Sequence, residues 1–321
     1  MRKLHIIIFM LVSGIIFNIF PDFNITVSAD EASGKFKNDV SWSISGNVLT
    51  VSGNGEMGDV KYQPYSSYSG NITEIIVEEG VASIGYGAFS NFSALRKVQL
   101  PQSLEYIDVN AFSYCYNLYD INIPDSVIYI GNNAFFGAYF LSSYTGNFII
   151  LGNGILYSYK GTDTDIVIPD GVTSISDRVF VSKNITSVHI PESVYYIGAG
   201  AFLNCPDLKS VTVPRYAEYI GENAFGYALN PAPEAVSDFI LYGFPDTQAQ
   251  FYAENSGISF RMKGDADSDG YVNSYDALCV LQYVSELTYA DSSQRFTADM
   301  DGDGNITSYD ALLILQYSVG L

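Results

Sequence analysis

A phenylalanine recurs at nearly constant spacing through the middle of this 321-residue chain, and this repeat limits the possible folds more than any other feature. The spacings are 23, 23, 45, 22 and 23 residues, for Phe89, Phe112, Phe135, Phe180, Phe202 and Phe225. One period holds too few apolar residues to form a core of its own, so neighbouring repeats must stack and bury their Phe, Ile and Leu columns together. The sequence therefore predicts a solenoid.

Each period also contains a short strand pattern of alternating apolar residues, as in Leu95, Val98 and Leu100. A proline such as Pro101 follows this pattern, where the missing amide donor does least harm to a sheet. The predicted fold class is a mainly β repeat solenoid, which resembles leucine-rich repeats, spanning residues 81–263, with a small all-α domain after it.

The double step of 45 residues marks an insertion in the solenoid. Residues 148–160 (FIILGNGILYSYK) contain two apolar runs around a Gly-Asn-Gly turn, which predicts a β-hairpin near residues 146–161 in place of one repeat. We expect residues 30–80 to cap the N-terminal end, with a hairpin at 40–57. Residues 236–263 are expected to cap the C-terminal end.

A twelve-residue acidic loop occurs twice near the C-terminus, 34 positions apart, at residues 265–276 and 299–310. Both copies place oxygen ligands at the positions that an EF-hand-type calcium loop uses, and a glycine follows the third aspartate. The predicted ligands are Asp265, Asp267, Asp269, the carbonyl of Tyr271, Asn273 and Asp276 in the first loop, and Asp299, Asp301, Asp303, the carbonyl of Asn305, Thr307 and Asp310 in the second. The predicted cofactors are two Ca²⁺ ions.

Two departures from an EF-hand point to a particular family. The last ligand is Asp rather than Glu, and no helix-forming stretch leads into the first loop. With the phrase SYDAL..LQY after each loop, residues 264–321 resemble the type I dockerin of cellulosome-type complexes. The resemblance implies a calcium-dependent contact with a cohesin module of a scaffold protein, made by Ser274, Tyr275, Leu281, Gln282, Ser308, Tyr309, Leu315 and Gln316. Because both copies carry the same residues, we expect two usable binding orientations.

This dockerin-like segment is too short to bury much apolar surface, so we expect calcium to decide whether it folds. The eight aspartates of the two loops repel one another without metal. We expect the helices after the loops to pack through Ala277, Leu278, Leu281, Ala311, Leu312 and Leu315.

The solenoid segment is similar to BspA-type leucine-rich repeats over about residues 81–225, and the resemblance implies a curved ladder of strands. Before it, Arg2, Lys3, an apolar run and a small-residue site at residues 27–29 are typical of a secretory signal peptide over residues 1–29. An uncleaved membrane anchor is the alternative. The net charge of −20 argues against nucleic acid and anionic membranes as partners.

Three cysteines are too few and too scattered for a disulfide framework. Cys115 and Cys205 occupy the same place in repeats four steps apart, about 20 Å at the spacing of stacked strands. We expect both, and Cys279, to be unpaired and buried.

No catalytic constellation is visible in the solenoid. After signal removal the one histidine is His189, with no catalytic Ser or Cys motif near it, so we expect no enzyme. Four tyrosines at one repeat position form the best candidate ligand surface, and aromatic rings in a row suit a sugar or a protein: Tyr106, Tyr129, Tyr196 and Tyr219. Alternatively, these rings only cover the ladder.

The sequence thus predicts a secreted, noncatalytic protein that attaches to a cohesin-bearing scaffold and presents its repeats to a polysaccharide or a cell-surface protein. Two alternatives remain open at this point. The solenoid could be a structural spacer, or a polysaccharide- or peptide-degrading subunit whose curvature brings a carboxylate pair together.

Overall fold

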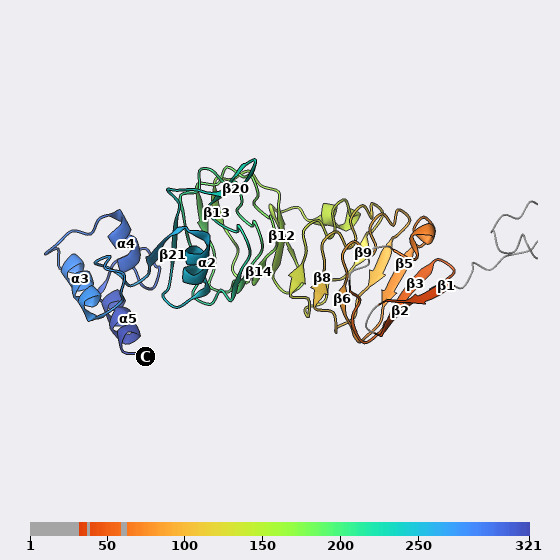
Figure 1. Cartoon of the computed structure of the whole chain (residues 1–321), viewed down its shortest axis with the longest axis horizontal. Coiled ribbons are helices and arrows are strands. Elements are labelled where there is room, and N and C mark those ends of the chain that lie inside the picture. Colours follow the sequence, from red (N-terminus) through yellow and green to blue (C-terminus); the bar gives the residue numbers. More distant parts are fainter. Residues whose placement is uncertain (1–31, 37–38, 59–62) are drawn as a thin grey trace, which may run out of the picture.

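The computed structural model describes residues 32–36, 39–58 and 63–321. The predicted signal peptide lies outside the described residues. Figure 1 shows an elongated molecule in which stacked β-strands run from the N-terminal end to a small group of helices at the C-terminal end. This is the β-solenoid with an α-helical C-terminal domain that the sequence predicts. Among the described residues, no helix is both long and apolar enough to cross a bilayer.

The N-terminal half of the solenoid consists of two strand ladders, one on each side of the core. The first ladder begins with an antiparallel cap and continues as parallel strands: β1 (Ala32–Lys35), β2 (Val40–Ser45), β3 (Val48–Gly53), β5 (Glu74–Val77), β7 (Lys97–Gln99) and β9 (Asp120–Ile121). The second ladder is parallel throughout: β4 (Gly55–Glu56), β6 (Val81–Ile84), β8 (Tyr106–Ile107) and β10 (Tyr129–Ile130). Short 3₁₀ helices lie at Ser66–Tyr68 and Tyr139–Ser143.

Both ladders stop where an antiparallel hairpin enters, formed by β11 (Phe148–Leu151) and β12 (Ile155–Tyr159). The hairpin starts a new ladder with β14 (Ser174–Ile175), β16 (Tyr196–Ile197) and β18 (Tyr219–Ile220). The opposite side carries β13 (Asp165–Val167) and β15 (Ser187–His189), then β17 (Ser210–Thr212), β21 (Ile240–Gly243) and β22 (Ser259–Met262). A short exposed hairpin, β19 (Tyr227–Asn230) and β20 (Ala232–Ala235), projects from the last repeat.

We call the junction at the hairpin the seam, because the apolar core divides there into two clusters. Ile155 packs with the N-terminal cluster, whereas the next residue, Leu156, packs with the C-terminal cluster. Alternate side chains of one strand point to opposite faces, so β12 contributes side chains to the cores of both halves. Its Tyr157 hydroxyl accepts a hydrogen bond from the Phe135 amide at 2.9 Å, in place of the carbonyl that a next repeat would supply.

The repeated phenylalanines stack along the middle of each half. The ring centroids of Phe112 and Phe135 are 5.5 Å apart, and those of Phe180 and Phe202 are 4.8 Å apart. All six repeated phenylalanines are at most 1% exposed. Burial of each such ring contributes about 1.5–3 kcal/mol, so this column explains why the phenylalanine period dominates the sequence.

Cys115 and Cys205 are unpaired and buried in equivalent positions, as predicted. Each thiol donates a hydrogen bond to a backbone carbonyl, that of Phe89 at 3.2 Å and that of Phe180 at 3.1 Å respectively. Burial raises the pKa of Cys115 to about 12 and that of Cys205 to about 11. Both thiols are therefore neutral and unreactive at physiological pH. Cys279 is also free and buried.

The C-terminal end of the solenoid is closed by α2 (Gln248–Ser256), which lies between β21 and β22 in the chain. Three further helices follow: α3 (Ser274–Val284), α4 (Ser292–Ala298) and α5 (Ser308–Ser318). Helices α3 and α5 lie beside each other at the end of the molecule (Figure 1).

Candidate calcium loops and cohesin-binding face

Two clusters of carboxylates lie in the predicted metal loops. Oxygens of Asp265, Asp267 and Asp269 all come within 4.8 Å of one another, as do oxygens of Asp299, Asp301 and Asp310. A calcium ion bound by several oxygens at 2.3–2.6 Å requires this degree of approach. The residues present therefore fit calcium in both loops.

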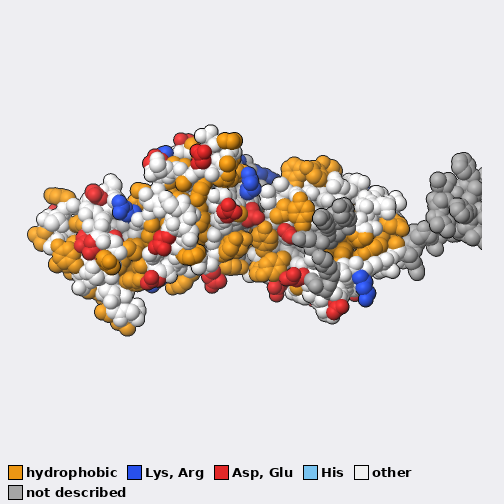
Figure 2. Space-filling model, viewed as in Figure 1, with side chains coloured by type: hydrophobic (Ala, Val, Ile, Leu, Met, Phe, Trp, Pro, Cys, Tyr) orange, Lys and Arg blue, Asp and Glu red, His pale blue; other side chains and the backbone are white. Residues whose placement is uncertain are grey.

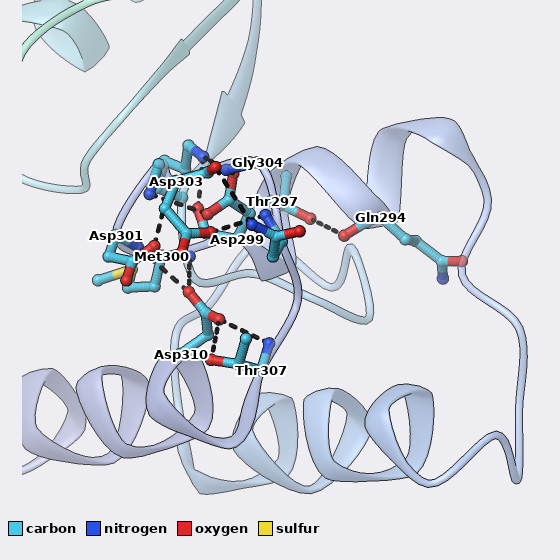
Figure 3. A network of polar contacts seen from close by, with 12 residues as sticks. Gln294, Thr297, Asp299, Met300, Asp301, Asp303, Gly304, Thr307 and Asp310 are labelled. Atoms are coloured by element: carbon cyan, nitrogen blue, oxygen red, sulfur yellow. Dashed lines mark hydrogen bonds and ion pairs between the residues drawn. The ribbon is translucent and has the colours of Figure 1, made fainter.

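The final aspartate of each loop is fully buried and joins the loop to the helix that follows. Asp310 accepts hydrogen bonds from the amides of Met300 and Thr307, both at 2.8 Å (Figure 3). Asp276 does the same with the amides of Ala266 and Asn273, both at 2.8 Å. These bonds explain why the chain uses Asp here, since its short side chain reaches the loop amides while it stays at the third position of the helix.

The ninth residue of each loop caps the following helix. Asn273 accepts a hydrogen bond from the Tyr275 amide at 2.7 Å, and Thr307 accepts one from the Tyr309 amide at 3.1 Å. Each forms a capping box with the final aspartate of its loop. Loop geometry and helix initiation therefore depend on the same side chains.

Three loop carboxylates, those of Asp265, Asp276 and Asp301, have a raised pKa. Burial is the main cause for Asp265 and Asp276, and the charge of Asp267 adds to it in both cases. Burial likewise raises the pKa of Asp301, with further contributions from Asp310, Asp303 and Asp299. A divalent cation would remove this electrostatic penalty.

The core of the helical domain differs from the predicted one. Ala277 and Ala311 are buried as expected, but Leu278, Leu281, Leu312 and Leu315 are 39–47% exposed. The core is built instead from Cys279, Val280 and Ile314, together with Ala298 at the end of α4 and with Ala266 and Met300 from the loops. The leucines lie off the helix–helix contact because small side chains allow α3 and α5 to approach closely.

All eight predicted cohesin contacts are at least partly accessible. Tyr275 and Tyr309 are 56% and 54% exposed, and Leu281 and Leu315 are exposed beside them. Ser274, Ser308 and Gln316 are exposed, while Gln282 is half-buried. Helices α3 and α5 thus each present one tyrosine and two leucines to solvent.

The second calcium loop is fastened to the last strand of the solenoid by Lys263, which sequence reasoning missed. Lys263 is 3% exposed; its ammonium donates to the backbone carbonyl of Asp299 and lies 3.8 Å from the Asp299 carboxylate. The ammonium is 4.4 Å from the centre of the Phe296 ring, which in turn packs on Tyr242 of β21. Burial lowers the pKa of Lys263, and the nearby Asp299 charge opposes this shift. The one sequence feature that points to a close contact between the two domains is that no long linker precedes Gly264.

The four tyrosines of the candidate ligand surface do come together across the seam. The rings of Tyr196 and Tyr219 stack with centroids 4.7 Å apart, and those of Tyr129 and Tyr196 meet edge to face at 5.8 Å. The Tyr129 hydroxyl donates to Asp177 at 2.8 Å, while Tyr106 and Tyr219 are 40% and 49% exposed. Burial is the largest cause of the raised pKa of Tyr129 and Tyr196, so both hydroxyls are neutral donors. His189 lies exposed on β15.

The fold and these loops define a class of protein, a repeat solenoid that ends in a small helical domain with two acidic loops. The BspA-type leucine-rich-repeat region matches six copies over residues 61–160 and 151–230, and the dockerin type I domain matches residues 263–317. This chain belongs to the BspA-type leucine-rich-repeat family and carries a type I dockerin domain. Neither matched family is catalytic.

Solved structures of leucine-rich-repeat proteins resemble the chain. A protein from Eubacterium ventriosum is 20% identical, with 68% of this chain and 74% of that chain covered and a TM-score of 0.29. A protein from Bacteroides ovatus is 21% identical, with 70% of this chain and 50% of that chain covered and a TM-score of 0.31. The leucine-rich-repeat protein of T. pallidum is 18% identical, with 72% and 95% covered and a TM-score of 0.29. A comparison with curated proteins finds no match.

Proposed function

We propose that this protein is secreted and attaches to a cohesin-bearing scaffold through its dockerin, with one calcium ion in each loop, and that its repeats bind a ligand. The observation that carries the proposal is the duplicated, solvent-exposed strip of tyrosine and leucine on α3 and α5, directly after two loops that fit calcium. Exposed apolar side chains on paired helices need a partner, and a cohesin is the partner that the dockerin family implies. Calorimetric titration with cohesin modules, with and without calcium, tests it.

The described part of the solenoid does not cover this strip. Phe296 and Tyr317 of the dockerin contact Lys263 and Arg215 of the solenoid; the Tyr317 ring lies 5.9 Å from the Arg215 guanidinium. The exposed leucines and tyrosines of α3 and α5 lie outside these contacts. Both copies of the strip are therefore open to a cohesin in the full chain, which supports two binding orientations.

For the solenoid we propose ligand recognition by the tyrosine column of Tyr106, Tyr129, Tyr196 and Tyr219. Stacked rings with hydroxyls at the rim offer rigid contact area to a sugar or to a protein surface. The spacer alternative is weaker because two of the rings keep about half of their surface in solvent rather than packing on the ladder.

Substitution of the two exposed tyrosines tests the column. We expect Tyr106→Ala with Tyr219→Ala to lower ligand binding at least tenfold in an array of glycans and cell-surface proteins, because each ring contributes about 1–2 kcal/mol at a contact. Tyr216→Ala, at an exposed turn outside the column, is the matched control. Equal binding by the double variant and the control, with thermal unfolding unchanged, would assign the column a covering role only.

A further inference from the structure

The seam leaves a groove in the solenoid with a volume of about 430 Å³. Its walls come from the repeat before the hairpin, from the hairpin itself and from the repeat after it, including Phe136, Lys160 and Arg178. In Figure 2, basic and acidic side chains lie beside hydrophobic ones at mid-length of the molecule.

Two backbone amides face this gap without the partner that other repeats provide. At the residue two before a repeated phenylalanine, the amide bonds to the next repeat where another repeat follows directly, as for Asn110 to Asn132 and Arg178 to Ala199, both at 3.1 Å. Among the described residues, the Asn223 amide of the last repeat has no such bond. At the residue two after the phenylalanine, the Tyr114 amide bonds to Phe136 at 2.7 Å. The equivalent amides of Asn133 and Gly137, which both line the groove, make no hydrogen bond within the described part of the chain. Unpaired amides attract an acceptor.

Two long side chains beside the groove stand at left-handed backbone positions that other repeats fill with Gly, Asn or Ser. The residue two before each repeated phenylalanine is left-handed in every copy: Gly87, Asn110, Asn133, Arg178, Gly200 and Asn223. Arg178, at φ 60°, is the one that is neither Gly nor Asn. Two residues after the phenylalanine, Tyr114 at φ 61° stands where other repeats have Asn91, Gly137, Ser182 and Asn204. Gly and Asn adopt this conformation most easily, so Arg and Tyr here carry a local cost.

The same two side chains are free to bind. The Arg178 guanidinium makes no ion pair, hydrogen bond or ring contact among the described residues. Tyr114 is 42% exposed, and its ring lies 5.4 Å from the exposed ring of Phe136. A backbone cost at an exposed, unpaired side chain is the pattern expected of a functional site rather than of packing.

We propose that the seam groove binds an acidic oligosaccharide, with a sugar ring on Phe136 and Tyr114 and a sugar carboxylate on Arg178 and the free amides of Asn133 and Gly137. Lys160 also lines the groove, and its ammonium donates hydrogen bonds to the carbonyls of Leu141 and Tyr144, at 3.1 and 3.3 Å. The one carboxylate in the lining, Asp177, accepts bonds from the Ala199 amide and the Tyr129 hydroxyl, both at 2.8 Å. The lining thus carries two cations and one anion. Two hydrogen-bond donors already stabilise the charge of that anion. Planar guanidinium matches a carboxylate, and aromatic rings match a sugar face.

This proposal rests on ligand recognition by the repeats, and it names the ligand class and a second site for it. Two sources share the chemistry, a uronic-acid polysaccharide and a sialylated glycan. Trigalacturonic acid and sialyllactose distinguish them, with cellotriose as the neutral probe, in calorimetric titrations of the full chain in calcium.

The decisive variant is Arg178→Asn, which removes the charge and installs a residue that three other repeats carry at this backbone position. We expect it to fold at least as well as the parent and to bind the acidic probe at least tenfold more weakly. Tyr114→Asn follows the same logic, while Lys209→Gln, an exposed cation elsewhere on the solenoid, leaves binding unchanged.

Binding of either acidic probe that is lost in Arg178→Asn establishes the site, and the probe that binds identifies the source. Three results overturn the proposal: no binding of either acid at millimolar concentration, equal binding of cellotriose, or undiminished binding of the acid by Arg178→Asn. Cohesin binding measured on the same samples is independent of the groove, so failure here leaves scaffold attachment standing.

Discussion

Chelation of calcium by EDTA is expected to unfold residues 264–321 while the solenoid keeps its structure. The two loops hold eight aspartates, and burial already raises the pKa of Asp265 and Asp276. The apolar core of this domain consists mainly of small residues such as Ala266, Ala277 and Ala311, so packing offers little to offset the repulsion. An ion present at a thousandfold excess over its dissociation constant contributes about 4.1 kcal/mol per site, which is enough to decide the fold of so small a domain.

Hydrogen exchange measured by mass spectrometry on the full chain reports each region separately. The amides of α3 and α5 should lose protection in EDTA, while those of the strands around Phe112 and Phe202 should not change. Asp265→Ala with Asp299→Ala should behave in calcium as the parent does in EDTA, whereas Asp238→Ala, whose carboxylate lies exposed on the solenoid, is the matched control. Full protection of α3 and α5 in EDTA would show that calcium is not part of the fold.

Disabling both helical faces of the dockerin is expected to abolish cohesin binding, while disabling either face alone is not. Tyr275→Ala with Leu281→Ala removes the first face, and Tyr309→Ala with Leu315→Ala removes the second. Each single-face variant should bind within about threefold of the parent, because the other face offers nearly the same side chains. The four-residue variant should lose at least a hundredfold, since two contact residues of about 1.5–2 kcal/mol each are missing from either orientation.

Tyr289→Ala, in the exposed segment between α3 and α4, is the control for these titrations. A large loss in one single-face variant and none in the other would show that only one orientation is used. Circular dichroism in calcium checks that all variants remain folded, which the exposed positions of these side chains favour.

The solenoid was predictable because its repeat places one large ring per turn at a buried position. The Phe112 ring can be buried only between the rings of Phe89 and Phe135 in the adjacent repeats. The repeat period alone therefore predicts a stack of rings. The strands, each of which ends shortly before a proline such as Pro101, could be predicted from the same repeat. The dockerin loops were predictable for a similar reason, because ligand spacing is set by the geometry around one ion.

What the sequence left open depends on contacts between elements. Helix α3 has an Ala277 and Val280 stripe and a Leu278 and Leu281 stripe, and both are apolar at helical spacing. Only the presence of α5 opposite decides that the smaller stripe is buried. The contacts of Lys263 could not be predicted, because no sequence pattern indicates that Phe296 and Asp299 fold back onto it. The seam groove could not be predicted from the sequence. It forms where backbone amides lack a neighbouring repeat, and no residue pattern indicates this.

Titration of the full chain with a panel of cohesin modules, first in calcium and then in EDTA, tests the central claim most directly. Scaffold attachment predicts tight binding to at least one cohesin in calcium, with one cohesin per chain, and no heat of binding in EDTA. Calcium uptake by both loops without binding to any cohesin would contradict it and would make the helical domain a metal-stabilised end to the solenoid.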